Sequence, residues 1–213
     1  MRKLLLHLAA GCIGLGITAH ATVINFNDLN MTDYSSIPDG YGSIAGVVDV
    51  SYRTLNNDAG FTEYSPHMEL WNTGYGDFFR NAFQIADGKF GEIVFTPHAG
   101  YSITLNGFDM AAYITGAGSR TESVIDIIYG STIQSFGPAQ ITRTTHDNFA
   151  PAGVTSSGPI KIRFGTDWNV GIDNIDFTAS AVPEPSTYLA GALLVLPFGV
   201  QGIRYLRTCK RVS

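Results

Sequence analysis

The chain has only two cysteines in 213 residues, and neither lies in its central part. Cys12 belongs to an N-terminal apolar run, and Cys209 lies close to the C-terminus. The long region between them therefore forms no disulfide, offers no thiolate nucleophile and contains no cysteine metal site. Its stability must come from a packed core.

Positively charged side chains are also scarce between residues 22 and 181. Seven Lys and Arg stand there against seventeen Asp and Glu, which gives a formal charge of −10, and the six other cations lie near the two ends of the chain. Cations supply most of the affinity for nucleic acid and anionic lipid, so such partners are not expected. An acidic surface suits divalent cations instead. About 160 residues are enough for one domain with a substantial core.

Helical periodicity is absent from this region as well. Apolar and polar residues alternate in short segments, as they do in half-buried strands, and clusters of Gly, Pro and Asn separate the segments. The expected strands are residues 22–29, 91–96, 102–105, 123–129, 160–164 and 171–177. About eight strands at this spacing predict an all-β domain over residues 22–181, an antiparallel two-sheet β-sandwich of the jelly-roll kind.

Residues 1–21 have the parts of a secretory signal peptide. Arg2 and Lys3 form a basic start, an apolar run follows, and Ala19-His20-Ala21 places small residues where cleavage before Thr22 requires them. Ala9-Ala10-Gly11-Cys12 is an alternative, lipoprotein-type cleavage site, but a shorter apolar run precedes it. We expect the Sec machinery to export the chain.

Residues 182–213 combine a Pro-Glu-Pro motif, an apolar run and a basic end. Pro183 and Pro185 hold the backbone around Glu184 extended. Residues 188–203 carry no charge and form the expected single transmembrane helix, although a comfortable span takes ~20 residues. The cations expected to stay in the cytoplasm are Arg204, Arg207, Lys210 and Arg211. A buried C-terminal core helix is the alternative, and it leaves these terminal cations without a role.

The order Val182-Pro183-Glu184-Pro185, apolar helix and basic tail resembles the PEP-CTERM sorting signal of Gram-negative bacteria. The resemblance implies that an exosortase in the cytoplasmic membrane recognises the motif and cleaves there. It also implies delivery to the cell surface, extracellular polysaccharide or biofilm. The resemblance covers only residues 182–213, so it carries no information about the domain that precedes them.

Four short motifs of the central region carry a second resemblance. They are Phe26-Asn27-Asp28-Leu29, Ile37-Pro38-Asp39-Gly40-Tyr41-Gly42, Thr104-Leu105-Asn106-Gly107-Phe108-Asp109-Met110 and Gly171-Ile172-Asp173-Asn174-Ile175. Together they resemble a recurrent PEP-CTERM ectodomain, whose fold is similar to galactose-binding-like jelly rolls and carbohydrate-binding modules. Asn27 stands where Asp is commoner, which removes one anionic oxygen. The resemblance implies no assigned activity.

A structural calcium ion is implied by the same resemblance, because many carbohydrate-binding jelly rolls hold Ca²⁺ near the ends of neighbouring first and last strands. Calcium takes six to eight oxygen ligands. The candidate ligands are Asn27, Asp28, Asp173 and Asn174. In the alternative interpretation, Asp28 and Asp173 accept hydrogen bonds from nearby backbone N–H groups and bind no metal.

Two aromatic-rich stretches form a candidate glycan-binding site. Sugar sites cover C–H surfaces with aromatic rings and bind hydroxyls with acids and amides. The candidate residues are Trp71, Tyr75 and Asp77 in one stretch and Trp168 in the other. Both tryptophans lie where strand alternation is absent, which is unusual for purely structural residues. The alternative is that these rings fill the core or plug an edge of the sandwich.

Signs of catalysis are missing. The three histidines of the domain lack the spacing of a zinc motif, and no Gly-x-Ser-x-Gly sequence occurs. The carboxylate pairs Glu63 with Glu69 and Glu122 with Asp126 are expected by chance in so acidic a domain. We therefore expect a non-catalytic surface or matrix protein that binds extracellular polysaccharide. A purely structural surface protein and a polysaccharide hydrolase are the alternatives.

Overall fold

The computed structural model describes residues 19–114 and 121–183. Most of the predicted signal peptide, the predicted transmembrane helix and the basic tail lie outside these ranges. Within them, no helix is long and apolar enough to cross a membrane.

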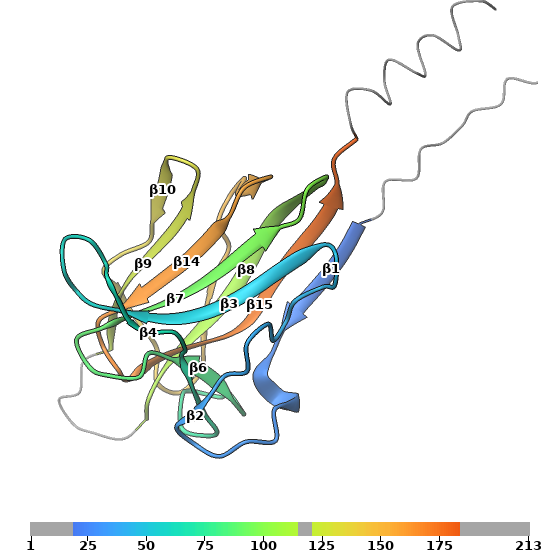
Figure 1. The fold of residues 1–213 in the computed structure, drawn as a ribbon. Helices are drawn as coiled ribbons and strands as arrows, with labels where there is room; N and C mark the ends of the chain where they lie inside the picture. Colours follow the sequence, from blue (N-terminus) through green and yellow to red (C-terminus); the bar gives the residue numbers. More distant parts are fainter. Residues whose placement is uncertain (1–18, 115–120, 184–213) are drawn as a thin grey trace, which may run out of the picture.

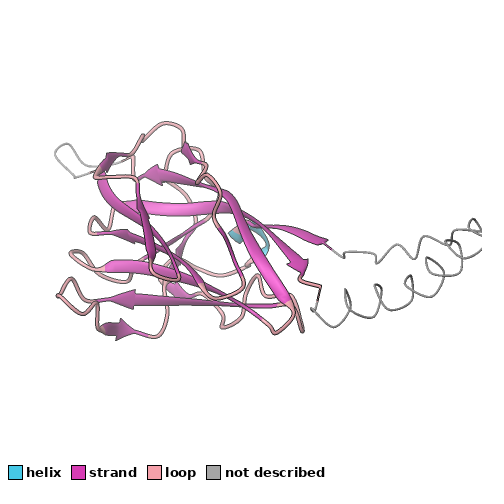
Figure 2. Ribbon diagram, turned by 90° about the horizontal axis from the view of Figure 1, so that it is seen from above, coloured by secondary structure: helices cyan, strands magenta, loops and turns pink. Residues whose placement is uncertain are grey.

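The described residues form two antiparallel β-sheets, as predicted (Figure 1). The first sheet contains β1 (Ala19–Ile24), β2 (Ser35–Ser36), β5 (Glu69–Trp71), β6 (Asn81–Phe83), β8 (Tyr101–Ala112), β12 (Asp147–Phe149), β13 (Thr155–Ser156) and β15 (Val170–Ala181). The second contains β3 (Val48–Leu55), β4 (Glu63–Ser65), β7 (Phe90–Pro97), β9 (Glu122–Tyr129), β10 (Thr132–Ser135), β11 (Ala139–Gln140) and β14 (Ile160–Gly165). The short 3₁₀ turn η1 (Phe26–Asp28) is drawn in cyan in Figure 2.

The strand order of each sheet follows from these pairings. The first sheet runs β12-β8-β15-β6-β5-β2, with β1 also on β15 and β13 also on β8. The second runs β10-β9-β14-β7-β3-β4, with β11 also on β9. Residues 19–114 and 121–183 form fifteen strands, where the sequence predicted about eight. Most of the additional strands are two to four residues long, and such short segments show no alternation that a pattern could detect. The exception is β3, which has eight alternating residues and was missed.

A continuous apolar core lies between the two sheets. Alternate residues of β7 and β14 point into it from the second sheet, and alternate residues of β8 and β15 point into it from the first. Phe95 of β7 and Phe177 of β15 meet across the core with ring centroids 5.1 Å apart. The domain is therefore a β-sandwich, stabilised by burial of apolar surface rather than by disulfides.

One predicted strand is wrong in its second half. The pattern predicted a strand over residues 22–29, but β1 ends at Ile24 and η1 follows. Phe26 is fully buried, and its backbone N–H donates to Asp173 Oδ1 at 3.3 Å. The strand ends because the Phe26 side chain packs into the core and its amide bonds to Asp173. The alternation of apolar residues in the sequence nevertheless continues.

Strand β15 joins the two ends of the described chain. Its C-terminal half pairs with β1, with Ser180 opposite Ala19 and Phe177 opposite Thr22, and Figure 1 shows the two strands side by side. The predicted signal cleavage before Thr22 would remove three residues of β1 and leave Thr22–Ile24 paired with β15. Both ends of the domain therefore lie at the same edge of the sandwich.

The outer face of the second sheet carries a buried ion-pair network. Glu92 of β7 is fully buried between Arg53 of β3 and Arg163 of β14, which are its partners in the two neighbouring strands. Arg53 Nε donates to Glu92 Oε1 at 2.8 Å, and Arg163 Nε donates to Glu92 Oε2 at 2.9 Å. The carboxylate thus ties three strands together.

Replacing Glu92 tests how much this network contributes. We expect Glu92→Gln to lower the free energy of unfolding by about 3 kcal/mol, because two partly buried guanidinium groups lose their only shared anion. Urea unfolding followed by circular dichroism measures the effect. Glu122→Gln, at an exposed position of β9 in the same sheet, is the matched control and should change stability by about 0.5 kcal/mol or less. Equal losses in the two variants would contradict this account.

Candidate ligand-binding site

Six aromatic side chains gather over the outer face of the first sheet, at the end where β15 begins. Tyr34 precedes β2, Trp71 and Phe83 end β5 and β6, Tyr75 and Tyr113 form a bridge beside β8, and Trp168 precedes β15. We call these residues the aromatic cluster: Tyr34, Trp71, Tyr75, Phe83, Tyr113 and Trp168. Neighbouring ring centroids lie between 4.9 Å and 6.4 Å apart. The two stretches singled out in the sequence therefore meet in space.

Alternation along β5 and β6 sets the direction of these side chains. Leu70 and Ala82 face the core, so their neighbours Trp71, Asn81 and Phe83 face outward. The sequence predicted a loop at Trp71, but this residue pairs with Asn81 and ends a three-residue strand. The prediction failed because so short a strand shows no alternation.

Tyr34 was not predicted from the sequence, and it is the most exposed ring of the cluster. The residue is 52% exposed, and its ring centroid lies 4.9 Å from that of Trp71 and 6.1 Å from that of Trp168. Its backbone N–H donates to Leu70 O at 2.9 Å, which fixes it beside β5. Turn-like residues surround Tyr34 in the sequence, so no local pattern marks its position.

Hydrogen bonds hold two other members of the cluster in place. Trp71 Nε1 donates to Thr73 O at 2.6 Å, and Tyr75 Oη donates to Trp168 O at 2.8 Å. Burial raises the pKa of Tyr75 above the usual range of a phenol, so this hydroxyl stays protonated. These bonds fix the orientation of the Trp71 and Tyr75 side chains. Trp168 is only partly buried.

Buried polar atoms without a hydrogen-bond partner in the described chain occur beneath the cluster at Asn81 and near Trp168. They are Asn81 Nδ2, Asn81 Oδ1, Gln84 Oε1 and Trp168 Nε1. Gln84 Nε2 does donate to Asp167 O at 2.8 Å, so only the side-chain oxygen of Gln84 lacks a partner within the described chain. A Cβ at Gly171 would come within 1.9 Å of Asn81 Nδ2, so the absence of a side chain at Gly171 leaves room for Asn81. A buried polar group without a partner costs about 1–3 kcal/mol.

The charged groups around the cluster are mainly acids. Asp33 Oδ1 accepts from Asn72 N at 2.8 Å, and Asp87 Oδ1 accepts from Trp168 N at 3.5 Å. Arg80 is nearby, but it donates to Asn72 Oδ1 at 2.9 Å and to Asn27 O at 2.7 Å. The edge of the site is therefore better suited to an uncharged ligand than to an anion.

Asp77, the remaining glycan candidate, pairs with His146 instead of turning to the tryptophans. His146 Nδ1 lies 2.9 Å from Asp77 Oδ1, and His146 Nε2 lies 3.7 Å from Asp109 Oδ2. The hydrogen bond with Asp77 is the main reason that the pKa of His146 is raised. Asp109 also accepts from Asn148 Nδ2 at 2.8 Å.

The four calcium candidates lie near one another, but each has a protein partner. Asp173 Oδ1 accepts from Phe26 N, Asn174 Nδ2 donates to Asp109 Oδ2 at 2.9 Å, Asp28 accepts from Tyr41 Oη, and the carbonyl of Asn27 accepts from Arg80. The pKa of Tyr41 is raised by burial first, then by Asp28 and Asp173. Among the described residues, no group of three or more His, Asp or Glu is placed to hold a metal ion.

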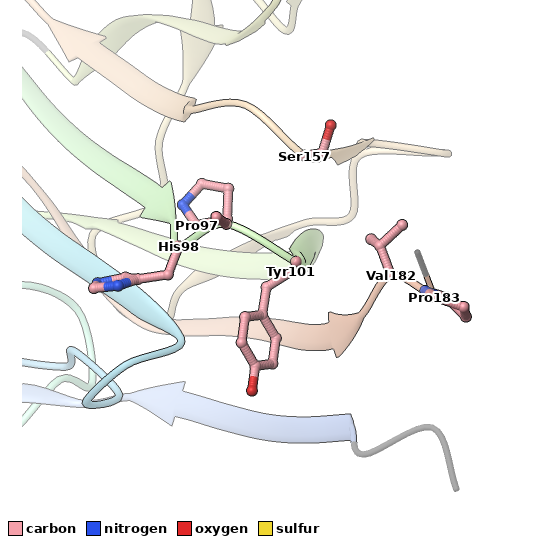
Figure 3. Close-up of a pocket in the computed structure, with 8 residues that line it drawn as sticks. Pro97, His98, Tyr101, Ser157, Val182 and Pro183 are labelled. Carbon is pink, nitrogen blue, oxygen red and sulfur yellow. The ribbon is translucent and has the colours of Figure 1, made fainter. Parts of the chain in front are cut away.

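The start of the predicted sorting motif lies at the opposite end of β15. Val182 N donates to Gly100 O at 2.7 Å, and Pro183 is the last described residue. Both residues line a shallow cavity of about 250 Å³ beside the turn that joins β7 to β8 (Figure 3). The other motif residues, Glu184 and Pro185, and the cations Arg204, Arg207, Lys210 and Arg211 lie outside the described ranges.

Comparison with known proteins adds no assignment. No protein-family model matches the chain, and no curated protein gives a significant match.

Buried Asp173 predicts how stability depends on pH. Burial raises its pKa from 3.8 to about 7, and the backbone N–H groups of Asn174 and Phe26 oppose the shift. The folded protein thus holds this proton more tightly than the unfolded chain. The stabilisation is complete below about pH 4 and is lost as the pH rises through about 7. His146, whose pKa is also raised, acts in the same direction at its own pH.

We therefore expect the free energy of unfolding to fall by roughly 2–3 kcal/mol between about pH 5 and about pH 7. Asp173→Asn should flatten most of this slope, and the exposed control Asp39→Asn should keep it. Urea unfolding with chelator present measures both. A parallel series with Ca²⁺ tests the calcium hypothesis, because bound calcium requires ionised Asp173. Identical melting midpoints with Ca²⁺ and with chelator would reject that site.

Proposed function

We propose that this chain is an exported surface or matrix protein whose β-sandwich domain binds extracellular polysaccharide and catalyses no reaction. The supporting observation is the aromatic cluster. Trp71 and Trp168 come from distant parts of the chain and both approach Tyr34, whose ring is half exposed. Partly exposed rings beside amides and carboxylates are the groups with which proteins hold sugars.

The proposal also assigns the β-sandwich to a finer fold class, the jelly roll. From β7 onward the chain passes back and forth between the sheets: β7 lies in the second, β8 in the first, β9 to β11 in the second, β12 and β13 in the first, β14 in the second and β15 in the first. Connections that cross between two antiparallel sheets are typical of Greek-key sandwiches. This alternation supports the resemblance to carbohydrate-binding jelly rolls.

Export and sorting are proposed from the two ends of the sequence. The Sec machinery would remove residues 1–21, and an exosortase would act at Pro183, Glu184 and Pro185 after residues 188–203 had halted in the membrane. The apolar helix is thus a membrane contact before processing. The C-terminal tail begins at one end of β15, and the aromatic cluster lies at the other end. The two ends are about 40 Å apart, because β15 has twelve residues. The cluster would face away from the membrane.

Calcium remains part of the proposal as a structural ion, with Asn27, Asp28, Asp173 and Asn174 as ligands. The pairing of β1 with β15 and the closeness of Asp28 and Asp173 to Tyr41 support it. The comparison of Ca²⁺ with chelator, described above, decides the matter.

Removing the two indole rings tests polysaccharide binding. We expect Trp71→Ala and Trp168→Ala each to lower retention of the protein in affinity electrophoresis through soluble polysaccharides, by about tenfold in affinity, because stacking area is lost. Ile133→Ala, at an exposed position of β10 in the other sheet, is the control and should migrate like the wild type. Unchanged retention of folded tryptophan variants would reject the site, and new reducing ends in the polysaccharide would favour a hydrolase.

Changing the sorting motif tests the route of export. We expect the wild-type protein in the medium to begin at Thr22 and to end near Val182 to Pro185. A variant with Glu184→Ala and both prolines replaced by alanine should stay in the membrane fraction with its tail attached, because the recognition element is lost. Intact-mass measurement of the medium and membrane fractions decides this. Release of the triple variant at the wild-type position would show that the motif is not the signal.

A further inference from the structure

The polar atoms buried beneath the aromatic cluster define the chemistry of a ligand. Two of them, Trp168 Nε1 and Asn81 Nδ2, are donors, and two, Gln84 Oε1 and Asn81 Oδ1, are acceptors. A hydroxyl group both donates and accepts, whereas a carboxylate only accepts and an ammonium only donates. A ligand with several hydroxyls is therefore the class that matches this mixture.

The orientation of the rings indicates which kind of polysaccharide fits the cluster. The ring planes of Tyr34 and Trp71 meet at 88°, and those of Tyr34 and Trp168 meet at 47°. Rings so arranged cannot lie together on one flat surface, so they do not fit the face of a crystalline polysaccharide. Because Tyr34 is half exposed, its free surface can stack on one sugar of a single chain.

The backbone at Tyr34 also indicates a functional position. Its φ is 65°, a left-handed conformation that bulky residues rarely adopt. Such strain persists where the surrounding structure enforces it, and it is common at ligand-binding positions. Here it directs an exposed ring between the two tryptophans.

We infer that the aromatic cluster is a subsite for a single, uncharged polysaccharide chain, with Tyr34 as its main stacking surface and Trp168 Nε1 as a hydroxyl contact. This inference rests on the proposed function and adds the substrate class to it. This contact requires the partly buried ring of Trp168 to turn, because Nε1 is covered in the structure. Carboxylates at the edge of the site, Asp33 and Asp87 among them, repel polysaccharides built from uronic acids.

Titration calorimetry of the full-length protein with three probes tests the class of ligand. The probes are a soluble neutral glucan, alginate and, by pull-down, crystalline cellulose. We expect binding of the glucan alone. Equal or tighter binding of alginate, or binding of cellulose, would overturn this inference but leave the proposed function in place. Binding of the glucan that Tyr34→Ala does not weaken would also overturn it. Binding of none of the three would reject both.

Matched variants test the residues. Tyr34→Ala should weaken glucan binding about tenfold, and Tyr34→Phe should restore it because the ring remains. Tyr64→Ala is the control, since Tyr64 is 51% exposed but lies on β4 of the other sheet. Weakening by Tyr64→Ala equal to that by Tyr34→Ala would contradict the assignment.

Trp168→Phe separates ligand contact from a structural role. It removes Nε1, which has no partner within the described chain, so the melting midpoint should stay unchanged or rise while glucan affinity falls severalfold. Trp71→Phe offers the contrast: its Nε1 donates to Thr73 O, so the melting midpoint should fall. A Trp168→Phe variant that melts earlier and binds glucan normally would show that Nε1 serves the fold.

Discussion

The pairing of β15 with its neighbours is the constraint on which the rest of the structure depends. This strand lies between β1 on one side and β8 on the other in its second half, and it contacts β6 near its start. Its inward side chains build the core with the second sheet, and its outward residues Gly171 and Asp173 lie under the aromatic cluster and beside η1. One strand thus connects the candidate site, the buried carboxylate and both ends of the domain.

Several buried polar groups of the domain lie on the outer face of the first sheet. Loops fold back over this face and bury Asn81, Asp109 and Asp173 there. Some of these groups find partners, as Asp109 does with Asn148 and Asn174. Those beneath the aromatic cluster do not, and burial without a partner is costly unless something else reaches the group. This contrast between the two halves of one face is the physical basis of the proposed ligand site.

The sequence predicts most of the parts of this fold that depend on local alternation, although it missed β3. Residues 91–96, 123–129 and 160–164 all lie in strands of the second sheet, because one face of each meets the core. It fails where contacts between distant residues decide the structure, as at Phe26, whose amide binds Asp173. The site follows the same rule. Trp71, Tyr75 and Trp168 were found by residue type, but Tyr34 and the pairing of Asp77 with His146 depend on the fold alone.

The most direct test of the account uses the two indole N–H groups of the chain, which give two separate signals in a ¹⁵N-labelled sample. A soluble neutral glucan is titrated into the protein and nuclear magnetic resonance records both signals. The account predicts that both signals shift in a saturable manner and that the signal of Trp168 moves further, because its N–H gains a hydroxyl partner. Two indole signals that stay in place at saturating glucan, in a folded protein, would contradict it.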